Sequence, residues 1–152
     1  MPATRNRNPA PATAMPSIFT QIIRRELPGE FVYETEREAA FLDLFPASDG
    51  HTLVVPKLEV ARFDELPPDH LTSLMHAVQL VAKGVTRAMG TPHYVLRNNN
   101  GAPAGQVVFH VHFHIMPRWE GVAMDKRRIE PEKMREFGQR IRAALAEVQA
   151  GR

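Results

Sequence analysis

The stretch Phe109–Arg118 alternates three histidines with large apolar side chains. Successive side chains of an extended strand point to opposite faces, so His110, His112 and His114 are expected to share one face of a strand, opposite an apolar face. Such a strand must be buried on its apolar side. Its other face presents a row of imidazoles, whose unperturbed pKa near neutrality suits them to attack, to transfer protons or to bind metal.

The composition bounds the size and setting of the protein. A chain of 152 residues is sufficient for one domain with a single core. Its apolar runs, such as Thr52–Val55, are far shorter than the ~20 residues that a membrane-spanning helix needs. Cysteine is absent, which removes disulfides and thiolate chemistry and favours a reducing compartment. We therefore expect a soluble, cytoplasmic protein with no membrane partner.

The charge distribution argues against a nucleic-acid partner. The formal net charge of +2 arises from Arg5 and Arg7, and the rest of the chain is electrically balanced. Nucleic-acid binding usually needs a concentrated cationic face. Residues 1–16 are rich in Pro, Ala, Asn and Thr and lack apolar periodicity, so we predict a disordered tail there and a single domain over 17–152.

Apolar spacing and breaker residues predict the order of secondary structure within 17–152. Ser17 is a candidate N-cap for a first short helix, and Gly90 suits the left-handed end of a long one. Helices are predicted from Ser17 to before Pro28, over 68–89 and from Pro131 onward, and strands over 31–35, 40–44, 51–56, 93–97 and 107–116. This order indicates an α+β fold with an antiparallel sheet.

The connection before the histidine strand, residues 98–105, contains three asparagines and two glycines. Such residues tolerate positive φ, and backbone amides exposed in loops of this kind can cradle an anion. An ordinary hairpin loop explains the composition equally well.

Three interpretations of the histidine row are open from the residues alone. The strand could simply carry a polar face. It could hold a metal, because His-x-His presents two nitrogens to one zinc, with further ligands from His51 or Asp43. It could also carry nucleophilic catalysis by imidazole on phosphorus. The lack of cysteine and of any carboxylate between Asn98 and Trp119 favours catalysis.

The segment His110–Met116 resembles the His-φ-His-φ-His-φ-φ signature, φ being apolar, of the histidine triad (HIT) family of nucleotide hydrolases and transferases. Further blocks resemble that family in the usual order: Ser17–Ile23 with Glu26–Pro28, Ala40–Asp43, Gly50–Lys57 and Asn99–Val108. The likeness covers about residues 17–120 and is greatest to bacterial members and the Hint branch. It implies a five-stranded antiparallel sheet with one long helix and short terminal helices.

The resemblance also implies an activity. Hint-like members hydrolyse purine nucleoside 5'-phosphoramidates, and the related Fhit branch cleaves dinucleoside polyphosphates. In both, the residue matching His112 attacks the α-phosphorus to form a nucleotidyl-histidine intermediate. His114 would then contact phosphate or protonate the leaving group, and His110 with His51 would orient the row. A metallohydrolase and a nucleotide-binding scaffold are the alternative functions.

The family pattern also suggests a nucleotide pocket. Asp43 would accept hydrogen bonds from the ribose hydroxyls, and Val107 stands where Hint-like members often have a hydroxyl residue that bonds the leaving group. The other residues that match the pocket are Phe19, Ile22, Phe41, Leu44, Asn99, Gly105 and Gln106.

A final resemblance concerns metal and assembly. Many bacterial relatives carry Cys-x-x-Cys where this chain has Ser17 and Thr20, and their thiolates join histidines matched here to His51 and His110 on a structural zinc. Hydroxyls are much poorer zinc ligands, so we predict no bound metal and no cofactor. The family also implies a homodimer.

Overall fold

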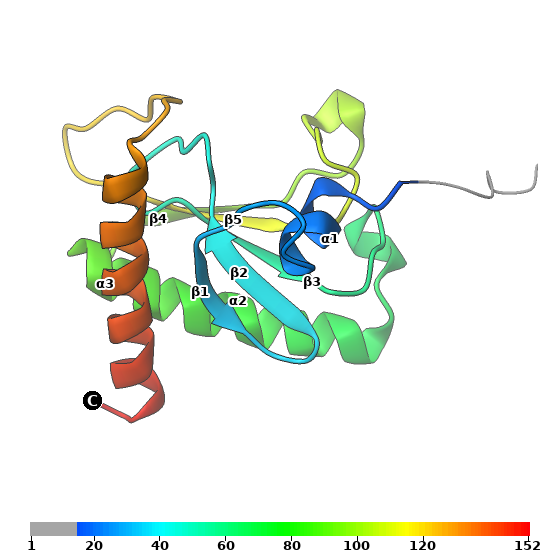
Figure 1. Cartoon of the computed structure of the whole chain (residues 1–152), viewed down its shortest axis with the longest axis horizontal. Helices are drawn as coiled ribbons and strands as arrows, with labels where there is room; N and C mark the ends of the chain where they lie inside the picture. The colour runs from blue at the N-terminus through cyan, green and yellow to red at the C-terminus, as the bar shows by residue number, and fades with distance from the viewer. Residues whose placement is uncertain (1–14) are drawn as a thin grey trace, which may run out of the picture.

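The computed structural model describes residues 15–152, so the predicted tail at residues 1–16, apart from Met15 and Pro16, lies outside the described residues. Three α-helices and five strands make up most of this range (Figure 1). The helices are α1 (Ile18–Ile23), α2 (Pro68–Met89) and α3 (Pro131–Gln149), and the strands are β1 (Phe31–Glu34), β2 (Glu38–Leu42), β3 (Thr52–Pro56), β4 (Tyr94–Arg97) and β5 (Phe113–Pro117). Single turns of 3-10 helix, Phe63–Glu65 and Ala102–Ala104, lie in two of the connections.

The strands form one antiparallel sheet in the order β1-β2-β3-β5-β4. The five-stranded α+β fold and the long helix are therefore as predicted. Ser17 caps α1 by accepting a hydrogen bond from the Thr20 amide, and Gly90 ends α2 in the left-handed region at φ 68°. One terminal helix is longer than expected, because α3 runs for 19 residues.

Two strand boundaries differ from the sequence-based prediction. β2 begins at Glu38, earlier than expected, because the Glu38 carboxylate accepts a hydrogen bond from the Thr35 hydroxyl and can therefore be buried in the sheet. β5 begins only at Phe113. Upstream of it, the Val111 amide bonds the carbonyl of Val60 in a loop instead of a neighbouring strand, although the side-chain alternation continues.

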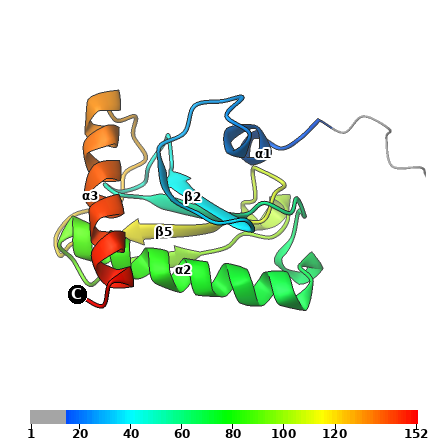
Figure 2. The same cartoon turned by 60° about the horizontal axis from the view of Figure 1, so that its bottom comes forward.

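Helices cover the two faces of the sheet unequally, as Figure 2 shows. The long helix α2 lies across one face, and α3 packs against α2 and the β1 end of the sheet. The apolar side chains between the histidines, Val111, Phe113 and Ile115, belong to the main core on this side. The short helix α1 lies over the other face, above a smaller cluster formed by Phe19, Ile22, Ala39, Phe41, Leu53 and Val55.

This asymmetry positions the functional face. The sheet is anchored by α2 on one side, while α1 covers only part of the opposite side, toward which the histidines point. None of the helices within residues 15–152 combines the length and apolar character needed to cross a membrane.

Candidate active site

A cavity of about 480 Å³ lies on the α1 side of the sheet. It contains His51, His112 and His114 together with eight of the nine residues expected to bind nucleotide. These eight are Phe19, Ile22, Phe41, Asp43, Leu44, Asn99, Gly105 and Val107. His110 and Gln106 are buried behind the wall of the cavity.

His112 stands at the centre of the row with a defined tautomer. Its Nδ1 lies 2.6 Å from the carbonyl oxygen of His110, which can only accept, so Nδ1 carries the proton and Nε2 keeps its lone pair. The edge of the Phe19 ring packs against the imidazole with centroids 4.8 Å apart, and the Asn98 amide bonds the His112 carbonyl. Burial lowers the pKa of His112, so the ring is neutral at pH 7. A fixed, neutral imidazole with a free nitrogen at a cavity is a competent nucleophile.

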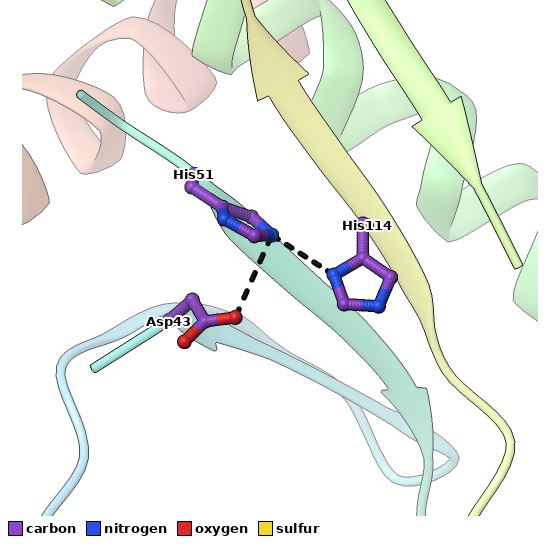
Figure 3. Close-up of side chains that lie close together, drawn as sticks. All are labelled: Asp43, His51 and His114. Atoms are coloured by element: carbon purple, nitrogen blue, oxygen red, sulfur yellow. Dashed lines mark hydrogen bonds and ion pairs between the residues drawn. The ribbon is translucent and has the colours of Figure 1, made fainter. Parts of the chain in front are cut away.

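His51 and His114 form a directed hydrogen-bond chain beside it (Figure 3). The Ala47 amide donates to His51 Nδ1 at 3.0 Å, which places the His51 proton on Nε2. That nitrogen donates to His114 Nδ1 at 2.9 Å. A neutral His114 therefore carries its own proton on Nε2, where it can donate to a bound group.

The electrostatics keep both of these rings uncharged. Burial lowers the pKa of His51 to about 3, with smaller contributions in the same direction from His114 and from the cations Lys126 and Arg97. Burial lowers the pKa of His114 to about 4, with smaller contributions in the same direction from His112 and the same two cations. At neutral pH the chain of donors and acceptors described above is thus the populated one.

His110 occupies a different environment at the closed end of the row. It is fully buried, and its Nε2 donates to the Pro56 carbonyl at 2.7 Å. Its Nδ1 consequently accepts from the Ser17 hydroxyl at 2.6 Å. Glu59 completes the cluster by accepting from the Thr20 hydroxyl and the Ser17 amide, and its carboxylate lies 3.8 Å from the His110 ring.

This geometry corrects the sequence-based grouping of His51 with Ser17, Thr20 and His110. His51 lies with Asp43 and His114 instead, and Glu59 stands beside the two hydroxyls. Each hydroxyl is already engaged in short hydrogen bonds to His110 or Glu59. The cluster therefore links α1 to the strand segment through hydrogen bonds, beside the apolar packing of Phe19 and Ile22.

Asp43 faces the cavity and also shapes the adjacent loop. One carboxylate oxygen accepts from the Phe45 amide at 2.8 Å, and the other lies 3.6 Å from His51 Nε2. Burial raises the pKa of this carboxyl. The second oxygen remains available to a ligand hydroxyl, so Asp43 combines a turn-forming role with a binding position.

The apolar end of the cavity and the Gly-rich loop form two further walls. Phe19 and Phe41 pack against each other with ring centroids 5.6 Å apart and form an apolar wall of the cavity against which a flat ring can stack. In the loop, Gly105 adopts φ 89° and Asn99 donates to the Ala104 carbonyl. Gln106 turns inward, donating to the carbonyls of Ala61 and Val108 and accepting from the Gly101 amide. Its side chain thus stabilises the loop instead of facing a ligand.

Sequence reasoning missed three groups near the row. Arg97 and Lys126 both line the cavity, and Glu59 joins the His110 cluster. Arg97 carried a detectable signal, because it ends the strand that leads into the Asn-rich loop. Lys126 and Glu59 lie in irregular connections, after β5 and after β3, where no periodic pattern indicates which way a side chain points.

The same region contains a set of potential metal ligands. One ligand atom each from Asp43, His51 and His114 lie within 4.8 Å of one another. Two imidazoles and a carboxylate suit a zinc ion. His51 Nε2, however, already donates its proton to His114, so a metal at this position would have to displace that proton and break the bond.

The model of the "HIT domain" family matches residues 24–121 of the chain. An adenylylsulfatase of Arabidopsis thaliana is 41% identical over 103 residues, which are 68% of this chain and 52% of that protein. An adenosine 5'-monophosphoramidase of Schizosaccharomyces pombe is 36% identical over 136 residues, covering 86% of this chain and 99% of that one. The crystal structure of a hypothetical histidine triad nucleotide-binding protein from Sulfolobus tokodaii superposes with a TM-score of 0.83 at 40% identity, covering 87% and 93% of the two chains. The chain therefore belongs to the HIT domain family.

Proposed function

We propose that the protein is a nucleotide hydrolase that cleaves the α-phosphorus bond of purine nucleotidyl conjugates through a nucleotidyl-His112 intermediate. The observation that carries this proposal is the geometry of His112, with Nδ1 bonded to the His110 carbonyl and Nε2 directed at the cavity. The names of the monophosphoramidase and adenylylsulfatase relatives support hydrolysis at a nucleotide phosphorus.

The reaction runs in two displacements. The Nε2 lone pair of His112 attacks the α-phosphorus, the bond to the leaving group breaks, and its electron pair departs with that group. The His110 carbonyl, still accepting from Nδ1, stabilises the positive charge that develops on the ring. Water then attacks the same phosphorus and loses a proton to solvent, while the P–Nε2 bond breaks with its electron pair returning to the ring, which releases the nucleoside monophosphate.

The remaining walls orient the substrate. The apolar wall formed by Phe19 and Phe41 would contact the base, and Asp43 would accept from a ribose hydroxyl. His114 Nε2 would donate to an oxygen of the phosphate, with its proton position fixed by His51. Leu44, Asn99 and Val107 complete the pocket.

The test is a turnover panel of adenosine 5'-phosphoramidate, adenylyl sulfate and a dinucleoside polyphosphate, with acid-quench trapping of the intermediate on the protein. We expect multiple turnovers on at least one substrate and labelling that maps to His112. His112→Asn should reduce kcat/KM by at least about a thousandfold while it retains adenosine monophosphate binding, because the chemical step depends on the nucleophile. Binding without turnover of any substrate would instead indicate a nucleotide-binding scaffold.

A metallohydrolase is the second candidate, favoured by the convergence of Asp43, His51 and His114. It predicts stoichiometric zinc that survives dialysis and activity that is lost with a chelator and regained with added metal. The hydrolase proposed above predicts activity that a chelator leaves unchanged.

We further propose that the protein is a homodimer that joins two copies along β4. This strand is at an edge of the sheet, and Tyr94 and Leu96 expose 44% and 48% of their surface on it. An apolar edge strand of this kind readily pairs with a second sheet. Light scattering should give a mass of twice the 17.1 kDa chain, and a concentration-independent monomer would contradict the proposal.

A further inference from the structure

Arg97 is directed to the histidine face by the register of the sheet. It is the direct cross-strand partner of His114 in the β4–β5 pair. Directly opposed residues in antiparallel strands place their side chains on the same face, within about 5.5 Å at Cβ. Arg97 accordingly lines the cavity beside His114.

Lys126 reaches the same cavity from the segment after β5. The residues on either side of it are fixed to another loop, because the Asp125 amide bonds the Ala47 carbonyl and the Arg127 amide bonds the Pro46 carbonyl. Arg127 also pairs with Asp49 at 2.7 Å. Lys126 is thus held between two anchored neighbours, with its side chain in the cavity wall.

Neither cation forms an ion pair with a carboxylate among residues 15–152, in contrast to Arg25 and Arg127, which pair with Glu34 and Asp49. Asp43 is the one carboxylate among the described residues that line the cavity, and its carboxyl is directed to the Phe45 amide and His51. Lys126 acts through space on the Asp43 carboxyl and works to lower its pKa against the effect of burial, so the two cations share one nearby carboxylate. A pair of cations in excess of the local negative charge attracts a substrate that brings its own negative charge.

The rest of the site is poorly equipped for an amine leaving group. An amine must gain a proton as it departs, and an acid catalyst works best when its pKa lies near the working pH. His114 accepts from His51 at Nδ1, so its ring is a neutral imidazole, and the one proton it holds, on Nε2, makes it a poor acid. The position expected to offer a hydroxyl to the leaving group is Val107, which cannot donate from its side chain and is largely exposed.

A leaving group such as sulfate or phosphate has the opposite requirement. It departs with the electron pair of the broken P–O bond as an oxyanion, and needs compensation of charge more than it needs a proton. Arg97 and Lys126 supply positive charge on the side of the row where His114 stands.

We propose that Arg97 and Lys126 form the leaving-group subsite of this hydrolase and select nucleotidyl conjugates whose leaving group is an anionic oxyacid over those that release an amine. This assignment rests on the proposed function, since it presupposes attack on the α-phosphorus by His112. It names the class of substrate that the cavity is built to cleave.

The experiment measures kcat/KM of Arg97→Gln, Lys126→Gln and the double variant on adenylyl sulfate, adenosine diphosphate and adenosine 5'-phosphoramidate. The wild-type protein should prefer at least one of the two oxyacid conjugates over the phosphoramidate. Each single variant should lose about tenfold on the oxyacid conjugates, because one charge-assisted contact is removed at a partly solvated site. The phosphoramidate should change by less than about threefold. Comparison of the sulfate and phosphate arms then identifies which oxyanion the subsite receives.

The matched control is Arg37→Gln, which removes a cation paired with Asp69 outside the cavity. It should leave all three activities unchanged. Equal losses on all three substrates in the Arg97 and Lys126 variants would show that these cations bind the α-phosphate, which would overturn the proposed selectivity. A wild-type protein that turns over the substrates without preferring either oxyacid conjugate would overturn this inference alone. Failure to turn over any of them would overturn the proposed function as well.

Discussion

The two ends of the histidine row are built from the same residue type but from opposite surroundings. His110 is fully buried, and both of its ring nitrogens bond to protein groups, the Pro56 carbonyl and the Ser17 hydroxyl. His114 lines a cavity, and only its Nδ1 is engaged, by His51. An imidazole whose two nitrogens are both hydrogen-bonded to the protein can stabilise the fold but has no free nitrogen for chemistry. An imidazole with one free N–H can donate to a ligand. The comparison predicts that changes at one end affect stability and that changes at the other affect turnover.

The largest expected effect is on stability at the closed end. His110→Ala removes a buried ring and leaves the Pro56 carbonyl and the Ser17 hydroxyl without their partner, so the free energy of unfolding should fall by about 3 kcal/mol. Urea denaturation followed by circular dichroism measures the change. The control is His76→Ala, which truncates an exposed histidine on α2 and should alter the free energy by less than about 0.5 kcal/mol. Equal stability of the two variants would contradict the structural role of His110.

The open end should show the reverse behaviour. His114→Asn removes the Nε2 donor that faces the cavity, and kcat/KM should fall by about a hundredfold with little change in the urea midpoint. Steady-state kinetics on the best substrate of the panel measures the loss. His93→Asn alters an exposed histidine near β4 and should retain full activity. Activity of His114→Asn within threefold of wild type would remove His114 from the reaction.

Acid titration isolates the contribution of His114. Burial lowers the pKa of His110 as well, so acid destabilises both ends and the substitution of one ring separates them. The pKa of His114 is lowered to about 4 in the folded state, against about 6.5 in the unfolded chain, so the unfolded state binds more protons between these values. The contribution of His114 to the free energy of unfolding is therefore fully present above pH 6.5 and is lost as the pH falls toward 4. The groups that face this ring are His51, His112, Asp43, Arg97 and Lys126.

In His114→Asn the slope of the unfolding free energy between pH 6 and 5 should decrease by about 1 kcal/mol per pH unit, since one group that is protonated mainly in the unfolded state is lost. Hydrogen bonds from Thr20 and Ser17 lower the pKa of Glu59 at the closed end, so its contribution is present above pH 4.5 and is lost only below that value. A Glu59→Gln variant should keep the wild-type slope between pH 6 and 5. A slope unchanged in His114→Asn would place the acid sensitivity elsewhere.

The sequence predicted the face on which the histidines lie better than it predicted the residues that contact them. Alternation along Phe109–Arg118 assigned the histidines to one face, because side-chain direction in an extended segment is a local property. The start of β2 was misplaced because Glu38 is buried with a hydrogen bond from Thr35, and a glutamate is normally exposed. The roles of Glu59 and Lys126 depend on loops that meet only in the folded chain.

The smallest expected effect on stability concerns the hydrogen bonds of Ser17, which connect α1 to His110 at the closed end. The Ser17 hydroxyl both caps α1 and donates to His110, so Ser17→Ala should lower the free energy of unfolding by about 1 kcal/mol. Ser17→Thr retains the hydroxyl and should recover most of this loss in the same urea titration. If the bond to His110 acts only on stability, kcat/KM of Ser17→Ala at a temperature far below unfolding stays within twofold of wild type. A larger loss of kcat with an unchanged urea midpoint would show that the Ser17–His110 bond also orients His112, because the His110 carbonyl accepts the Nδ1 proton of His112. The closed end would then contribute to turnover as well as to stability, and the division between the two ends would no longer hold.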